Sequence, residues 1–145
     1  MRWTMVSTAI SLIAIFGATA ATAREDTGKR FSLALDGAAE APGPGDPDGT
    51  GMAILRINPG RGQLCFSLRV SGIGPATAAH VHEAPAGEPG PVVVGVTAPT
   101  SGSSEGCVDI DREQALEIIR APEEYYINVH NTEYPAGALR AQLDQ

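Results

Sequence analysis

Residues 52–71 decide the fold class, and they read MAILRINPGRGQLCFSLRVS. From Leu64 to Val70 in this stretch, apolar side chains alternate with other side chains. A period of two places successive side chains on opposite faces, which predicts a strand with one buried face. The central NPGRG combines residues that are typical of a tight turn between two strands. The stretch therefore predicts an antiparallel β-hairpin.

Similar short segments follow one another through the rest of the chain and bring the expected total to about eight strands. The additional strands are expected near residues 31–36, 78–82, 92–96, 107–110, 125–130 and 139–143. Loops rich in Gly and Pro are expected at residues 36–51, 84–90 and 97–106. Short, regularly spaced strands with such loops predict an all-β fold, an antiparallel β-sandwich.

One segment has the period of a helix. Asp111 is a suitable N-cap, Gln114 follows three residues later as in a capping box, and Pro122 ends the segment. An apolar stripe is supplied by Ala115, Leu116, Ile118 and Ile119. We expect one short crossover helix over residues 112–120.

The first 23 residues have the features of a signal peptide. Arg2 precedes an apolar, uncharged run, and Ala21-Thr22-Ala23 matches the small-x-small cleavage pattern. The alternative is an uncleaved N-terminal anchor, because the run approaches the length that spans a bilayer. Cleavage would leave residues 24–145 as one periplasmic or secreted domain without a membrane span.

The net charge of the chain is −7 at pH 7. An acidic surface argues against nucleic acid and anionic lipid as partners. Residues 46–49, Asp-Pro-Asp-Gly, resemble part of a calcium loop, but the spacing of an EF-hand is missing. We therefore expect a solvated hairpin loop there.

Cys65 and Cys107 are the only cysteines. In an exported protein they predict a disulfide, which the chain-entropy model values at about 4 kcal/mol. The alternatives are two free thiols or a thiolate metal site. Each cysteine lies opposite the apolar face of its strand, so the bridge should stay within one sheet or reach a covering loop, and should not cross the interior.

Three histidines, the only ones in the chain, fall in two of the expected strands. His80 and His82 lie in the sequence AAHVH, and His130 ends the sequence YINVH. His80 and His82 share a face of their strand, and His130 shares a face with Asn128. If the two strands are neighbours, the three rings meet. Three imidazoles with an open position suit copper or zinc.

A ring that binds a metal needs an acceptor for its second N–H group. Asn128, Glu83 and Glu133 are near in sequence and are candidates for that role. The alternative is that the three histidines hydrogen-bond loop backbone and hold the end of the sandwich together, or bind some other ligand. The sequence leaves these readings open.

The motifs together resemble a known family, the CHRD domain, which is named for repeats in chordin and is widespread in bacterial exported proteins. The resemblance rests on the runs ATAAHVH (76–82), GEPGPVVV (87–94), YINVHN (126–131), YPAG (134–137) and LRAQL (139–143). It implies an immunoglobulin-like, Greek-key β-sandwich, akin to the barrel of copper/zinc superoxide dismutase. Ala138 and Ala141 depart from the family pattern, where an acidic residue and a glycine are common.

The expected function is binding. A superoxide dismutase centre calls for more histidines than the three present, and a histidine brace needs a histidine at the mature N-terminus, near Arg24. No serine, cysteine or threonine has the context of a nucleophile. We expect a non-enzymatic domain that captures copper or zinc through the three histidines. The alternative is a metal-free structural or adhesive module of the envelope that binds protein or glycan; the sequence does not indicate the oligomeric state.

Overall fold

The structure is a computed structural model that describes residues 28–144, so the predicted signal peptide lies outside the described residues. It contains β1 (Lys29–Asp36), β2 (Thr50–Asn58), β3 (Gln63–Ser71), β4 (Ala76–Glu83), β5 (Val92–Val96), β6 (Ser103–Asp109), α1 (Arg112–Arg120), the 3-10 helix η1 (Pro122–Glu124), β7 (Tyr125–Asn131) and β8 (Leu139–Gln142). No helix within residues 28–144 has the length and apolar character needed to cross a membrane.

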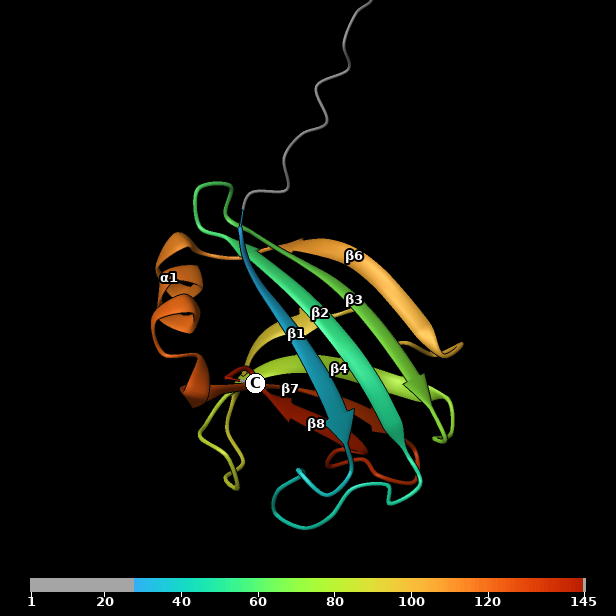
Figure 1. Ribbon diagram of the computed structural model, residues 1–145. Coiled ribbons are helices and arrows are strands. Elements are labelled where there is room, and N and C mark those ends of the chain that lie inside the picture. The colour runs from blue at the N-terminus through green and yellow to red at the C-terminus, as the bar shows by residue number, and fades with distance from the viewer. Residues whose placement is uncertain (1–27, 145) are drawn as a thin grey trace, which may run out of the picture.

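The eight strands form one antiparallel sheet in the order β5-β4-β7-β8-β1-β2-β3-β6. The sheet folds over so that β1, β2, β3 and β6 form one layer and the other four strands form the second (Figure 1). The layers are joined where β1 pairs with β8, at the single register position Asp36 and Arg140. The predicted all-β sandwich is confirmed, with both layers drawn from one nearly closed sheet.

The hairpin predicted from residues 52–71 is formed by β2 and β3, with Ile57 opposite Leu64. Gly62 in its turn has a φ of +61°, a left-handed conformation that favours glycine. The predicted alternation is also observed, since the inward side chains of the strands are buried. The largest fully buried ones are Leu33, Leu55, Ile57, Leu64, Leu68, Ile127 and Leu139. Each contributes about 1.5–3 kcal/mol of hydrophobic stabilisation.

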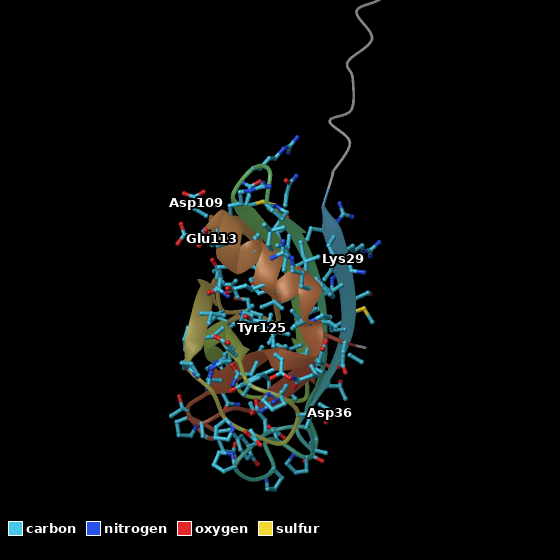
Figure 2. All side chains as sticks on the ribbon, turned by 90° about the vertical axis from the view of Figure 1, so that its left-hand side faces the viewer. Lys29, Asp36, Asp109, Glu113 and Tyr125 are labelled. Atoms are coloured by element: carbon cyan, nitrogen blue, oxygen red, sulfur yellow. A yellow bond between two sulfur atoms is a disulfide. The ribbon has the colours of Figure 1, made fainter. Side chains whose placement is uncertain are left out.

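Helix α1 has the predicted bounds and leads from β6 in one layer to β7 in the other. Figure 2 shows it lying across one side of the molecule, with Tyr125 nearby. Its buried residues are Ala115 and Ile118. The predicted capping box is wrong, because Asp111 caps the helix without a side-chain hydrogen bond, and Gln114 Nε2 donates to Tyr125 Oη at 3.5 Å.

The predicted disulfide is confirmed between Cys65 and Cys107, which lie directly opposite each other in β3 and β6. Their Cα atoms are 3.9 Å apart, and Cys107 is exposed. The bridge therefore lies on the outer face of one layer and does not cross the interior, as the facing pattern predicted.

Two loop predictions need correction. The loop expected at 97–106 ends early, because β6 begins at Ser103, which pairs with Arg69 of β3. Residues 103–106 are small or polar and lie on an edge strand, so they show no apolar alternation that would predict a strand. The loop after β1 is not solvated throughout: Glu40 and Asp46 are buried, and Asp46 N donates to Ala138 O at 2.9 Å.

A candidate metal centre on the outer face of the sheet

The two histidine segments are neighbouring strands. In the register of β4 and β7, His80 lies opposite Asn128, and His130 lies opposite Ala78. The three rings therefore project from the same, outer face of the sheet. One nitrogen from each of His80, His82 and His130 lies within 4.8 Å of the other two. The predicted juxtaposition of the rings is thus present in the structure.

Two of the rings contact each other. His80 Nδ1 lies 3.1 Å from His130 Nε2, and His130 Nδ1 lies 3.1 Å from Pro135 O. A carbonyl oxygen only accepts, so the neutral His130 ring carries its proton on Nδ1. Its Nε2 then accepts the hydrogen bond from His80 Nδ1–H. The loop after β7 thus fixes the tautomer of His130 and points its lone pair at His80.

His82 has the same arrangement with another loop. Its Nδ1 donates to Gly90 O at 2.9 Å, which leaves a lone pair on Nε2. The ring is only 7 % exposed, and Nε2 is buried without a hydrogen-bond partner among residues 28–144. Leaving such a buried acceptor unpaired costs about 1–3 kcal/mol. A ligand that binds to this nitrogen would therefore remove that cost.

Gly90 approaches the strand more closely than another residue could. A Cβ atom at this position would overlap the carbonyl oxygen of Glu83. Gly90 N–H also donates to Tyr126 Oη at 3.2 Å, and the Tyr126 ring stacks on His82 at 4.7 Å with an interplanar angle of 4°. The GEPGP segment (residues 87–91) therefore holds the His82 ring in two ways. The Gly90 carbonyl accepts from the ring, and the Gly90 N–H group fixes the Tyr126 ring that stacks on it.

Arg140 of β8 also holds the loop that ends at Gly90. Its side chain is 1 % exposed, and it donates to Glu88 O at 2.8 Å and Pro85 O at 2.9 Å. Its guanidinium carbon lies 3.5 Å from the centroid of the Tyr126 ring. This role was not predicted from the sequence, where the signal was a basic residue between the apolar Leu139 and Ala141 of β8.

Burial within the cluster lowers the pKa of His80, and the neighbouring His130 and His82 lower it further. Burial also lowers the pKa of His130, although its hydrogen bond to Pro135 acts in the opposite direction. Both shifts favour neutral imidazole at neutral pH, which is the form that binds metal ions.

The hydrogen bonds of the ring nitrogens go to backbone carbonyls and to each other, so the roles assigned to Asn128, Glu83 and Glu133 stay predictions. Asn128 lies beside His80, is 2 % exposed, and its Oδ1 has no partner among the described residues. Glu83 is exposed and affects the pKa of Tyr125. Glu133 is exposed in the loop after β7.

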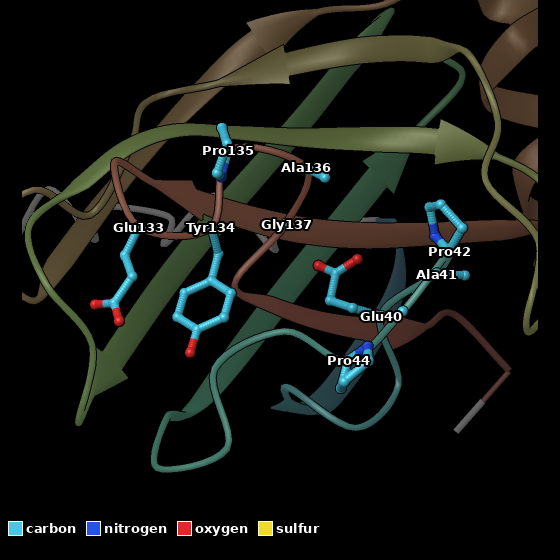
Figure 3. Close-up of a pocket in the computed structure, with 10 residues that line it drawn as sticks. Glu40, Ala41, Pro42, Pro44, Glu133, Tyr134, Pro135, Ala136 and Gly137 are labelled. Atoms are coloured by element: carbon cyan, nitrogen blue, oxygen red, sulfur yellow. The ribbon is translucent and has the colours of Figure 1, made fainter.

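A cavity of about 190 Å³ lies beside this loop, between residues 40–44 and 133–137 (Figure 3). The Glu40 carboxylate points toward Gly137, whereas the Glu133 side chain points away from Glu40. Burial raises the pKa of Glu40 to about 7, although Arg140 and a hydrogen bond from Asn128 lower it. The two carboxylates do not converge, so they do not form a second metal site.

One comparison with known proteins identifies a family. The sequence model of the CHRD domain family matches residues 31–143. No curated protein and no solved structure matches the chain.

Proposed function

This chain belongs to the CHRD domain family, and we propose that its domain binds one transition metal ion through His80, His82 and His130. Copper is favoured over zinc because nitrogen ligands bind Cu²⁺ more tightly than Zn²⁺. The ion is the cargo or resident ligand of a binding domain, and no catalytic role is assigned to it.

The buried lone pair of His82 Nε2 carries the proposal. It has no partner among the described residues, and it lies in a cluster with two further imidazole rings. The carbonyls of Gly90 and Pro135 hold the tautomers that place a lone pair on Nε2 of His82 and of His130. Such carbonyl partners are the usual supports of histidine ligands.

The spacing supports a metal ion as well. Metal–nitrogen bonds of about 2.0–2.1 Å in tetrahedral geometry place the ligand nitrogens roughly 3.4 Å apart. Because all three nitrogens already lie within 4.8 Å, side-chain movements of roughly 1 Å complete the set.

Asn128 is the best-supported partner for His80 in the loaded state. A metal ion on His130 Nε2 displaces the hydrogen bond from His80, and the freed N–H group needs a new acceptor. Asn128 Oδ1 is a buried acceptor without a partner among residues 28–144, directly across the strand pair from His80. Glu83 and Glu133 are less suited, because both are exposed.

We also propose that the domain works outside the cytoplasm, in a periplasm or after secretion. The Cys65–Cys107 disulfide supports this, because such bonds persist in oxidising compartments. The N-terminal sequence features of a signal peptide point in the same direction.

Metal analysis and copper titration of protein without a histidine tag test the proposed function. We expect one copper ion per chain, and we expect His80→Ala to weaken binding at least about tenfold, or 1.4 kcal/mol, through loss of a ligand. Ser32→Ala, on the exposed face of β1, is the matched control. Equal affinity of His80→Ala and wild type contradicts the proposed site. If no metal binds, the metal-free structural or adhesive module takes its place.

A further inference from the structure

We propose that the ion held by the three histidines binds a small anion from solvent, in a coordination position that opens over Gly95 of β5. This inference rests on the proposed function, since it assigns a second ligand to the same site. It goes beyond ion capture because it makes the domain a receptor for an anion whenever the metal is bound.

The donor set requires a compensating charge. Three imidazoles bind as neutral ligands, so a divalent ion keeps its full charge at a partly buried position. No carboxylate joins the cluster among the described residues. The Glu40 carboxylate interacts instead with the charge of Arg140 and with a hydrogen bond from Asn128. Glu83 is exposed at the end of β4. A ligand from solvent is therefore the available source of negative charge.

The surroundings of the cluster determine where that ligand enters. The loop ending at Gly90 contacts His82 at Nδ1, and the loop containing Pro135 contacts His130 at Nδ1. On the β7 side of His80 stands the buried Asn128. The neighbour of His80 on its other side is Gly95, which is exposed.

Gly95 leaves this side of His80 open. A Cβ atom at Gly95 would meet no atom within 4 Å, and a side chain there would share the outer face with His80. The φ angle of Gly95 is also not positive, so its backbone conformation does not require glycine. A larger residue is therefore compatible with the fold and would occupy the space through which an anion reaches the ion.

Azide titration of the copper(II)-loaded protein tests the inference, with charge-transfer absorption and electron paramagnetic resonance as readouts. We expect one azide per copper in the wild type. Gly95→Leu should weaken azide binding at least tenfold and leave copper affinity within threefold of wild type. Ser32→Leu, which enlarges an exposed strand position in the other layer, should change neither value. Circular dichroism confirms that both variants fold.

The possible failures are distinct. If the wild type does not bind copper, the proposed function fails and this inference fails with it. If copper binds but azide leaves both spectra unchanged, the anion site is wrong and metal capture stands. If Gly95→Leu binds azide as the wild type does, the opening over Gly95 is wrong.

Discussion

The apolar interior and the polar layer outside it are built by alternate residues of the same strands. In β7, Ile127 and Val129 point into the interior and are fully buried, while Tyr126 and Asn128 point outward and are 3 % and 2 % exposed. The two faces of β7 are therefore almost equally buried. The inner face packs against the opposite layer, whereas loops cover the outer face.

The difference between these regions lies in what holds them together. Apolar contacts are not directional, so the interior depends mainly on shape and volume. The polar layer depends on directional hydrogen bonds from Arg140 and Gln142 to loop carbonyls, such as Gln142 Nε2 to Ala84 O at 2.8 Å. We infer that both regions contribute to stability, and that the polar layer also determines the position of the His82 ring.

The largest effect is expected for Arg140→Met. The change removes the donors to Pro85 O and Glu88 O and leaves Glu40 without the positive charge that lowers its pKa. Leaving each of these carbonyl acceptors without its donor costs about 1–3 kcal/mol, and several are affected at once. Urea unfolding measures this loss, and copper titration should show weaker binding because the Gly90 loop is no longer fixed.

Arg69→Met is the control for that experiment. Arg69 is exposed on the outer face of β3, so its replacement should change the free energy of unfolding by less than about 0.5 kcal/mol. If Arg140→Met binds copper as tightly as the wild type, the loop does not position His82 through Arg140.

A smaller loss of stability is expected for Leu55→Ala in the interior. Leu55 is fully buried in β2, and its truncation costs about 3 kcal/mol through lost burial and a residual cavity. Copper affinity, measured by titration below the unfolding transition, should stay within twofold of wild type. A parallel loss of affinity would mean that the two regions are not independent.

The smallest effect concerns Glu40 and depends on pH. Its pKa is about 7 in the folded protein, against 4.5 ordinarily. Protonated Glu40 therefore contributes to the free energy of unfolding. The contribution is fully present below pH 4.5 and is lost as the pH rises through 7. Glu40→Gln, which keeps the neutral shape, should raise Tm by a few degrees at pH 8 and leave it nearly unchanged at pH 4. Equal Tm differences at both pH values would place Glu40 in a solvated environment.

Much of the fold was predictable because it repeats a local rule. The alternation from Leu64 to Val70 places its apolar side chains inward whatever the topology, and the turn at Gly62 specifies the hairpin. The outward direction of Cys65 followed from the same alternation. The second half of β6 was predicted, but residues 103–106 were assigned to a loop because they have no apolar face.

The candidate site was predictable only in its ligands. The spacing of His80 and His82 fixes a shared face, and the pairing of β4 with β7 brings His130 to it. The groups that orient the rings, Gly90 O and Pro135 O, are backbone atoms that carry no sequence signature. By the alternation alone, Arg140 is an ordinary outward residue of a strand.

The sequence by itself determined which side chains face inward and outward, since the period of a strand is a property of local backbone geometry. Only the tertiary structure decided that one outward face is covered and the other is not. Loops 37–49 and 84–91 pack over β4, β7 and β8, whereas Met52 on β2 remains 51 % exposed. Contacts between segments far apart in the chain depend on chain topology, and they turn three outward histidines into a partly buried cluster.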